Sequence, residues 1–284
     1  MTTSPSVRAR PRRVGDAPVV RRSIIGIVLL ISAIVLVAPI VIIFTKAFSS
    51  GIAAIGDSLM EPSTFHAIKL TVLTALVVVP INTMFGIAAA WAVTKFRFRG
   101  RAFLIVLIEI PFSVSPIVAG VAYLFVYGTQ GLFGPALDYL DIKIMFTVPA
   151  IMLASLFVTA PFVARELIPL MQVQGTEQEE AAHSLGASGL ATFMRVTLPN
   201  VKWALLYGVM LCNARVMGEF GAVSVVSGKI RGVTSTLPLQ IELLYQDYNI
   251  AGSFAAAIVL AAIALATIAV KAVVEHYSPQ PSSR

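Results

Sequence analysis

The first candidates for chemistry are two ionisable residues inside a long apolar run. Arg215 and Glu219 are four residues apart, so a helix places both side chains on one face. A charged side chain at the centre of a membrane helix costs about 2.5 to 3.5 kcal/mol, so the pair should face the protein interior or a wet cavity. Arg215 could then contact a translocated anion while Glu219 holds it in position. The alternative is an ion pair that only stabilises packing.

Other ionisable residues in apolar runs are alternative partners for this pair. Glu109 lies in an earlier run, and Arg165 and Glu166 lie together in the next one. We expect Arg165 and Glu166 near the cytoplasmic end of their run, where long side chains can reach water at the membrane surface.

Serine hydroxyls provide hydrogen-bond donors near these charges. An inorganic oxyanion has only acceptor oxygens, so its route needs hydroxyls, amides, helix N-termini or arginine. Ser224 and Ser227 follow Glu219 at three-residue spacing, and Ser113 and Ser115 lie in an apolar run that prolines interrupt. We place these four serines along a hypothetical translocation pathway, although a serine in a membrane helix often donates only to its own backbone.

A polar segment, residues 172–199, separates two of the apolar runs, and we call it the docking segment. Thr176 and Glu179 have the Thr-x-x-Glu spacing of a capping box, which predicts a short helix that begins there. Gly186 predicts a left-handed end to that helix. A second short helical turn is predicted at residues 190–194.

Small side chains characterise the predicted helix of the docking segment. Ala181 and Ala182 follow Glu180, and they leave the backbone open to close approach by another protein. Leu198 and Pro199 begin the next apolar helix, since proline is tolerated in a first turn. We therefore predict that this segment binds a partner; an ordinary solvated loop is the alternative.

The chain has no sequence motif for using ATP or for catalysis. The phosphate-binding pattern Gly-x-x-x-x-Gly-Lys-Ser/Thr and the nucleophile elbow Gly-x-Ser-x-Gly do not occur. The histidines His66, His183 and His276 are far apart in the sequence, and no histidine–cysteine cluster has metal-ligand spacing. We predict no catalytic residue, no metal and no cofactor bound by this chain, so any use of ATP requires a separate ATPase.

Composition indicates a membrane protein. Hydrophobic residues make up 57% of the 284 residues and charged residues 12%, against about 25% charged in soluble domains. The single cysteine, Cys212, lies in an apolar run and should pack as a small hydrophobe. A net charge of +7 would suggest a nucleic-acid partner for a soluble chain. Here the arginines lie mainly at the ends of apolar runs, so we expect a lipid bilayer and no nucleic acid.

Six apolar runs are long enough to cross a bilayer, which predicts an all-α membrane protein with six transmembrane helices. The first run is too long for a signal-peptide core and lacks a cleavage site, so it should stay in the membrane. Prolines predict kinks, and the third run should break near Pro111 and Pro116. The runs cover about residues 24–44, 68–93, 102–127, 146–170, 201–226 and 250–274.

Basic residues predict the orientation, because loops rich in lysine and arginine face the cytoplasm. Six arginines lie in a Ser- and Pro-rich tail, residues 1–22, which we expect to be disordered. Four basic residues lie between the second and third runs, at residues 95–101. Both places should be cytoplasmic, and an even number of spans returns the short tail 276–284 to the same side. The docking segment then also faces the cytoplasm, and residues 23–275 form one membrane domain.

The docking segment resembles the cytoplasmic coupling loop of ABC-importer permeases, where that loop binds the ATPase. The resemblance rests on Glu180-Ala181-Ala182, on Gly186 and on Val196-Thr197-Leu198-Pro199. Val196 replaces an isoleucine and is the one departure. The resemblance implies that the coupling positions are Glu180, Ala181, Ala182, Gly186, Leu198 and Pro199.

A second resemblance links the fifth apolar run to the sulfate and molybdate permeases. It rests on Asn213–Ala222, continues through Val223–Gly232 and Thr236–Glu242, and includes the proline-broken stretch Ile110–Pro116. The similarity covers about residues 20–275. It implies the fold of a type I ABC-importer permease.

The resemblance also implies a function and a set of partners. The chain would be a membrane subunit of an ATP-driven sulfate/thiosulfate importer, multi-pass in the bacterial inner membrane and without an ATPase site of its own. The expected partners are a homologous CysT-type permease subunit, two CysA-type ATPase subunits that use the ATP, and an extracytoplasmic sulfate/thiosulfate-binding protein.

Other functions stay open at this point. Within the importer class, molybdate or another oxyanion is the alternative substrate. A secondary transporter would use Glu109, Glu219 or Arg215 as an ion relay and would need no ATPase. A membrane-embedded enzyme would need a reactive cluster, and the sequence contains none that we identify.

Overall fold

Helices are the regular elements throughout the described part of the protein. We describe residues 18–49 and 51–277 of a computed structural model; residues 1–17 and 278–284, which hold most of the two predicted tails, lie outside it. The helices are α1 (Pro18–Ser32), α2 (Ala38–Ser49), α3 (Ile52–Met60), α4 (Pro62–Lys95), α5 (Arg101–Ser113), α6 (Pro116–Tyr127), α7 (Gly134–Tyr139), α8 (Val148–Thr159), α9 (Pro161–Gln174), α10 (Glu177–Ser184), α11 (Gly189–Thr192), α12 (Leu198–Met217), α13 (Gly221–Val226), α14 (Leu237–Gln246) and α15 (Ile250–Tyr277). The predicted all-α class is confirmed.

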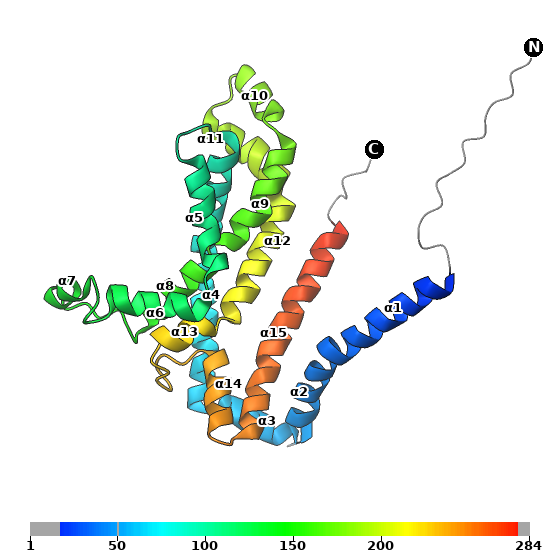
Figure 1. Cartoon of the computed structure of the whole chain (residues 1–284), viewed down its shortest axis with the longest axis vertical. Coiled ribbons are helices and arrows are strands. Elements are labelled where there is room, and N and C mark those ends of the chain that lie inside the picture. Colours follow the sequence, from blue (N-terminus) through cyan, green and yellow to red (C-terminus); the bar gives the residue numbers. More distant parts are fainter. Residues whose placement is uncertain (1–17, 50, 278–284) are drawn as a thin grey trace, which may run out of the picture.

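The helices form an elongated bundle with distinct ends. Figure 1 shows α10 and α11 of the docking segment at one end and α3 and α14 at the other. α15 runs from the α14 end back toward the end where the docking segment lies. The short helices α3, α7 and α14 lie in connections that the sequence indicated only as loops between spans.

Five of the six predicted spans are confirmed, and the third corresponds to a sharply bent pair of helices. Within the described residues, five helical stretches are long and apolar enough to cross a membrane, and the pair α5–α6 makes a sixth with a bend of 108°. The bend lies at residues 114–115, because proline at 116 disfavours a helical conformation in the residue before it. Pro111, in contrast, lies inside α5 and does not end it.

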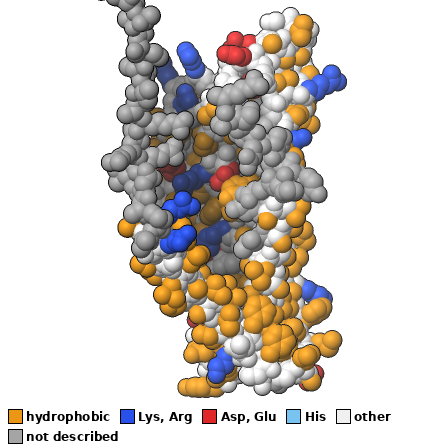
Figure 2. All heavy atoms as spheres, turned by 90° about the vertical axis from the view of Figure 1, so that its right-hand side faces the viewer, with side chains coloured by type: hydrophobic (Ala, Val, Ile, Leu, Met, Phe, Trp, Pro, Cys, Tyr) orange, Lys and Arg blue, Asp and Glu red, His pale blue; other side chains and the backbone are white. Residues whose placement is uncertain are grey.

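The first span begins earlier than predicted. α1 starts at Pro18, so residues 18–22, which we assigned to the tail, are helical, and a π-helical turn over Ala33–Val37 joins α1 to α2. Its most apolar stretch is not buried by the rest of the chain, as expected of a helix that faces lipid. Figure 2 shows the same apolar character on a wider scale, with hydrophobic side chains over most of the lower half of the visible face.

The core forms where α4, α9 and α12 pack against one another. Small residues let these helices approach closely, as is common between membrane helices. At Gly86 of α4, an added Cβ would lie 2.6 Å from Cβ of Val163 and 3.0 Å from the backbone nitrogen of Ala164 on α9. Cys212 of α12 is buried in this core and packs as a hydrophobe, as predicted.

We predict that Gly86→Ala destabilises the bundle by about 1 to 3 kcal/mol, because a side chain there overpacks the α4–α9 contact. Gly56→Ala on α3 is the control, since a Cβ there meets nothing within 4 Å. Alanine at position 56 should stabilise its helix slightly. Thermal unfolding of the detergent-purified protein measures both changes, and equal melting temperatures for the two variants would contradict the close approach.

Candidate functional site

The docking segment folds around α10, and its predicted end is confirmed. Gly186 follows α10 with φ of +87°, in the left-handed region that glycine adopts without strain. Its N–H donates to the carbonyl of His183 at 2.9 Å, and the N–H of Ala187 donates to that of Ala182 at 3.0 Å. These two bonds define a Schellman motif, which satisfies carbonyls that the helix end leaves open.

The capping box predicted at the start of α10 is wrong. Thr176 occupies the N-cap position, but its hydroxyl donates to the Glu180 carboxylate at 2.6 Å and does not accept a backbone N–H. Glu179 does not reach back to the N-cap, because its carboxylate is bound by residues from other helices. The Thr-x-x-Glu spacing therefore predicted where α10 starts, but it did not predict the hydrogen bonds that Thr176 and Glu179 make.

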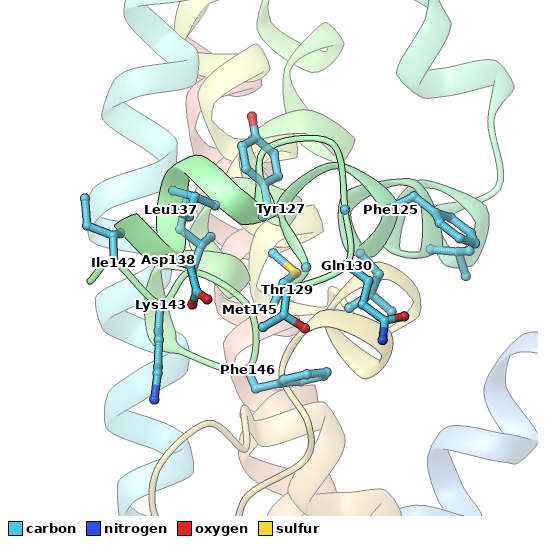
Figure 3. A pocket seen from close by; sticks show the side chains of 16 residues that line it. Phe125, Tyr127, Thr129, Gln130, Leu137, Asp138, Ile142, Lys143, Met145 and Phe146 are labelled. Atoms are coloured by element: carbon cyan, nitrogen blue, oxygen red, sulfur yellow. The ribbon is translucent and has the colours of Figure 1, made fainter. Parts of the chain in front are cut away.

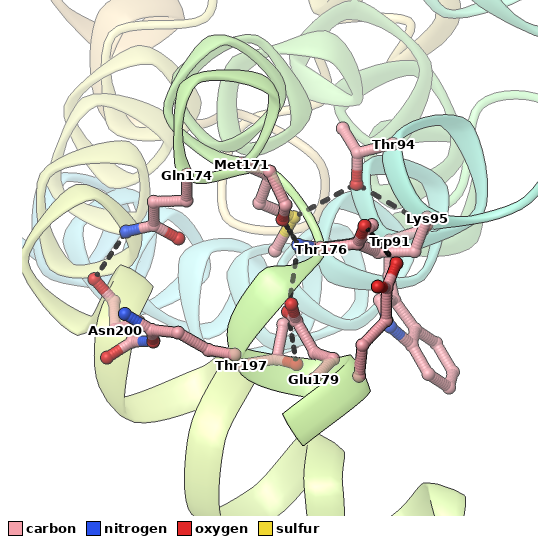
Figure 4. A network of polar contacts seen from close by, with 12 residues as sticks. Trp91, Thr94, Lys95, Met171, Gln174, Thr176, Glu179, Thr197 and Asn200 are labelled. Carbon is pink, nitrogen blue, oxygen red and sulfur yellow. Dashed lines mark hydrogen bonds and ion pairs between the residues drawn. The ribbon is translucent and has the colours of Figure 1, made fainter. Parts of the chain in front are cut away.

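Glu179 is held by an ion pair with Lys95, the last residue of α4. The Lys95 ammonium lies 2.8 Å from the Glu179 carboxylate, and the two side chains are 8% and 16% exposed. The Thr197 hydroxyl donates to the same carboxylate at 3.1 Å, and Lys95 also donates to the carbonyl of Gly175. Figure 4 shows Lys95, Thr197 and Glu179 converging from separate elements. We call this set the Lys95–Glu179 bridge.

Electrostatics at the Lys95–Glu179 bridge favour the charged form of Glu179. Partial burial alone would raise the pKa of this carboxyl, but the hydrogen bonds and charge of Lys95, with the Thr197 hydroxyl, lower it overall. Glu179 is therefore ionised at neutral pH, and the bridge is a charge-assisted contact.

A second contact ties the docking segment to α9 and α12. Asn200, in the first turn of α12, donates from its amide to the Gln178 side chain on α10. Its own carbonyl accepts from Gln174, the last residue of α9, at 3.2 Å. α10 is thus bonded to α4 and α12, and α12 is bonded in turn to α9, so the docking segment is linked to the three helices that form the core.

The outer surface of the docking segment carries exposed hydrophobic side chains. Leu185 is 90% exposed, and Leu190 and Met194 are also exposed. Glu180 and Ala181 are exposed on the preceding helix. Apolar side chains that gather at the polar end of a membrane protein mark an interaction surface.

The second half of the docking segment is more continuous than predicted. α11 begins with Ser188, whose hydroxyl accepts the Ala191 N–H at 3.3 Å, and a π-helical turn over Phe193–Thr197 leads into α12. α12 begins at Leu198 with Pro199 in its first turn, as predicted. Pro199 is exposed and Leu198 is half-buried.

A second group of candidate residues surrounds interruptions in three spans. The interruptions are at residues 114–115, residue 160 and residues 218–220. The third was not predicted, because the fifth apolar run reads as one continuous helix. Interrupted membrane helices expose backbone groups, which are tolerated only where protein or a water-filled cavity satisfies them.

The three interruptions lie in contact with one another. The ring of Phe112, just before the first, lies 6.3 Å from that of Phe162, just after the second. Pro116, just after the first, meets Gly221, just after the third, where an added Cβ would lie 2.9 Å from the proline Cβ. We call this region the broken-helix junction.

Arg215 and Glu219 meet at the broken-helix junction, and their predicted pairing is confirmed. The Arg215 guanidinium lies 2.6 Å from the Glu219 carboxylate, and the two side chains are 34% and 1% exposed. They do not share one helix, because α12 ends at Met217. The second carboxylate oxygen of Glu219 accepts the Ala222 N–H at 3.0 Å, at the start of α13. Glu219 therefore joins the two halves of the interrupted span.

The four candidate serines are only partly brought together. Ser113 and Ser115 are exposed beside the first interruption, and the Ser113 hydroxyl donates to its own helix at Glu109. Ser224 donates to the Gly221 carbonyl at 2.8 Å, and the buried Ser227 hydroxyl accepts a backbone N–H in the following turn. Ser224 and Ser227 thus have local backbone partners, while Ser115 lies closest to the junction in the sequence.

Arg165 has a neighbour that the sequence did not predict. It occupies the second turn of α9, next to the broken-helix junction, and its guanidinium lies 4.3 Å from the centroid of the Phe112 ring.

Lys95 and Thr197 were not predicted as functional residues. Lys95 was counted only as an orientation signal, and no local spacing links it to Glu179.

Other parts of the described chain add no further site of the predicted kinds. A cavity of about 570 Å³ between α6 and the start of α8 is lined by Tyr127, Asp138, Lys143 and Phe146 among others, and by none of the predicted site residues (Figure 3). No group of three histidine, cysteine or acidic side chains in residues 18–49 and 51–277 lies close enough to hold a metal ion.

Five membrane spans, a sixth if the bent pair α5–α6 is one span, and an exposed docking segment linked to the core are the architecture of a membrane permease subunit. Residues 82–280 match the family of binding-protein-dependent transport system inner membrane components. The chain belongs to this family.

Named relatives extend the comparison. The chain is 54% identical over 252 residues to the sulfate transport system permease protein CysW of Escherichia coli strain K12, covering 89% of this chain and 87% of that protein. It is 35% identical over 239 residues to the sulfate transport system permease protein CysT of Salmonella typhimurium, covering 84% and 86%.

Solved structures confirm the predicted fold. A bacterial ABC transporter for import of the acidic polysaccharide alginate matches 92% of this chain and 96% of its own with a TM-score of 0.78 at 15% identity. The same type of transporter in complex with a pentasaccharide-bound periplasmic protein matches with a TM-score of 0.75 at 14% identity. At these identities the match establishes the fold, which is that of an ABC-importer permease.

Proposed function

We propose that this chain is a membrane subunit of an ATP-driven importer of sulfate or thiosulfate, and that its docking segment receives the work of a separate ATPase. The observation that carries the proposal is the attachment of α10 to α4 through the Lys95–Glu179 bridge and to α12 through Asn200, which also binds α9. The sulfate substrate is supported by the names of relatives that are 54% and 35% identical to this chain over 252 and 239 aligned residues.

The proposed orientation places the docking segment and both chain ends in the cytoplasm of a bacterium, with the spans in its inner membrane. The concentration of lysine and arginine before α1 and between α4 and α5 supports this. Counting the bent pair α5–α6 as one span gives six spans, and an even number would return the end of α15 to the side on which α1 begins.

The proposed assembly has four kinds of subunit. A homologous CysT-type permease would complete the pathway, two CysA-type ATPases would bind the docking segments and use the ATP, and an extracytoplasmic binding protein would deliver the anion. The similarity of this chain to a CysT protein supports a pair of related permeases. The exposed Leu185 and Leu190 support contact of the docking segment with another chain.

In the proposed mechanism, the ATPases would displace α10, and the Lys95–Glu179 bridge and Asn200 would pass this displacement to the core helices. A packed bundle responds to such a push by switching between discrete arrangements, not by continuous deformation. The broken-helix junction is the natural place for that switch, because interrupted helices bend with little loss of hydrogen bonding. Arg215, held by Glu219, would contact the anion as it passes.

We predict that Gly186→Asp leaves the protein inserted in the membrane but abolishes ATPase association and lowers sulfate uptake at least tenfold. A Cβ at Gly186 meets nothing within 4 Å, so the cost within this chain is limited to strain of about 1 to 2 kcal/mol. The main effect is a charge and added bulk on the docking surface. Co-purification of the ATPase and uptake of labelled sulfate in cells measure the two effects.

Gly232→Asp is the control for this substitution. Gly232 also has a positive φ, +69°, and its position is equally open, but it lies between α13 and α14. It should keep ATPase association and uptake. Unchanged sulfate uptake in Gly186→Asp would contradict the proposed docking role.

The preferred anion is settled by competition. We expect unlabelled sulfate and thiosulfate to suppress uptake of labelled sulfate by the assembled complex, and molybdate to suppress it only at much higher concentration. Stronger suppression by molybdate would assign the importer to that oxyanion.

A further inference from the structure

Arg165 carries a positive charge at a position where the packing of the helices does not require a charged residue. It lies on α9 within a membrane span, and its side chain is exposed on the surface of this chain. A cation in the hydrocarbon region is costly, and such residues face a bundle interior or a wet cavity. The exposed surface around Arg165 is therefore expected to face water or another subunit and not lipid.

The aromatic ring of Phe112 holds the Arg165 guanidinium at the broken-helix junction. The guanidinium carbon lies 4.3 Å from the ring centroid, within the range of a cation–π contact. Phe112 is itself fixed by its contact with Phe162 on α9. A guanidinium that stacks on a ring by its flat face keeps its N–H donors at the edge, where they can bind an oxyanion.

A cavity of about 260 Å³ opens beside Arg165. It is lined by Phe112, Phe162, Arg165, Glu166 and Leu211, and it has room for several water molecules or a small oxyanion. Glu166 follows Arg165 directly, and adjacent helical residues do not face each other. Its Cβ points toward α12, where an added Cβ on Gly208 would lie 3.3 Å from it. Glu166 therefore borders both this cavity and α12.

The cavity and Arg215 lie along one face of α12. Leu211 lines the cavity, and Arg215 is four residues further on, so the two side chains share a helix face about 6 Å apart along the axis. Ser113, next to Phe112, is exposed at the same interruption. Arg165, Arg215 and Ser113 therefore all lie at the broken-helix junction.

We propose that Arg165 is an anion-binding residue of the translocation pathway, with Phe112 as its positioning residue and a tetrahedral oxyanion as its ligand. The inference rests on the proposed function. Arg215, which pairs with the buried Glu219 carboxylate, does not line this cavity. Arg165 contributes positive charge at the junction and supplies several N–H donors to an anion that has only acceptors.

The test uses the whole complex, with its second permease, ATPases and binding protein, reconstituted in liposomes. Uptake of labelled sulfate and hydrolysis of ATP are measured together, with binding protein in excess. Arg165→Gln should lower uptake at least tenfold while hydrolysis stays within about twofold, so the uptake per ATP falls. Arg165→Lys should recover part of the uptake, and Phe112→Leu should lower it severalfold, because the charge remains but its orientation is lost.

Lys69→Gln is the matched control. Lys69 is also exposed and lies 4.4 Å from the centroid of an aromatic ring, that of Phe65, but near the start of α4 and away from the junction. It should leave uptake per ATP unchanged.

Two results would overturn the role of Arg165. One is normal uptake by Arg165→Gln. The other is a parallel fall in uptake, hydrolysis and recovery of the assembled complex, which indicates a structural role. Absence of sulfate uptake by the unaltered complex would instead overturn the proposed function, and it is visible before any variant is measured.

Discussion

Reversing either charge of the Lys95–Glu179 bridge is expected to stop transport, and reversing both is expected to restore much of it. Lys95→Glu places two carboxylates where an ion pair now measures 2.8 Å, and Glu179→Lys places two ammonium groups there. Removing one partner of a buried pair costs about 3 to 5 kcal/mol, and two like charges at this separation cost more. α10 would then detach from α4.

The expected signature is loss of coupling, not loss of folding. The contacts of Asn200 with Gln178 and Gln174 remain, so the docking segment stays attached to α9 and α12. Each single reversal should lower sulfate uptake at least tenfold and leave ATP hydrolysis largely intact. The double reversal, Lys95→Glu with Glu179→Lys, rebuilds an attractive pair and should recover a substantial fraction of uptake. Reconstituted complexes assayed for both activities give the comparison.

An exposed ion pair at another site is the control. Arg231 and Asp247 form an ion pair in which both side chains are 46% exposed, and they lie on the α13–α14 side of the molecule. Exposed pairs contribute only about 0 to 1 kcal/mol, so single reversals there should change uptake little. If single reversals at Lys95 or Glu179 were equally mild, or if the double reversal recovered nothing, the bridge would not transmit motion.

Glu219→Ala is the second substitution with a large expected effect. It leaves Arg215 without its carboxylate partner and the Ala222 N–H without its acceptor at the start of α13. Loss of one partner from a buried pair costs about 3 to 5 kcal/mol, and the one-third exposure of Arg215 places the expected cost at the lower end of this range. We expect a clear fall in thermal stability together with loss of uptake.

Glu219→Gln separates the two roles of this side chain. The amide oxygen can still accept the Ala222 N–H, but the negative charge beside Arg215 is lost. We expect this variant to be more stable than Glu219→Ala and still impaired in uptake. Thermal unfolding of the purified complex, measured beside uptake, distinguishes them; wild-type stability in Glu219→Ala would show that the carboxylate does not join α12 to α13.

The parts of the structure that follow from local pattern were predictable. Long apolar runs predict the spans, because a helix satisfies all the backbone hydrogen bonds of such a run within the bilayer. The break before Pro116 and the left-handed end at Gly186 depend on backbone chemistry that neighbouring residues determine. These predictions are confirmed in the described residues.

The parts that depend on distant residues were not predictable. Glu179 has the spacing of a capping box, but Lys95 and Thr197 offer its carboxylate stronger partners from other helices. Gly218 and Gly221 are only a weak sequence signal for the interruption after Met217. The structure alone shows that Glu219 accepts the Ala222 N–H at the start of α13. Arg165 was expected at a membrane surface, and its position over Phe112 depends on how two interrupted spans cross.

The central claim is that the docking segment meets an ATPase in the cytoplasm, and labelling of Leu185→Cys tests it most directly. The side chain at this position is 90% exposed, and the native Cys212 is buried, so a membrane-impermeant maleimide should report position 185 alone. We predict no labelling in intact cells, strong labelling in inside-out vesicles stripped of the ATPase, and protection when the ATPase is added back. Labelling of intact cells from outside would contradict the account.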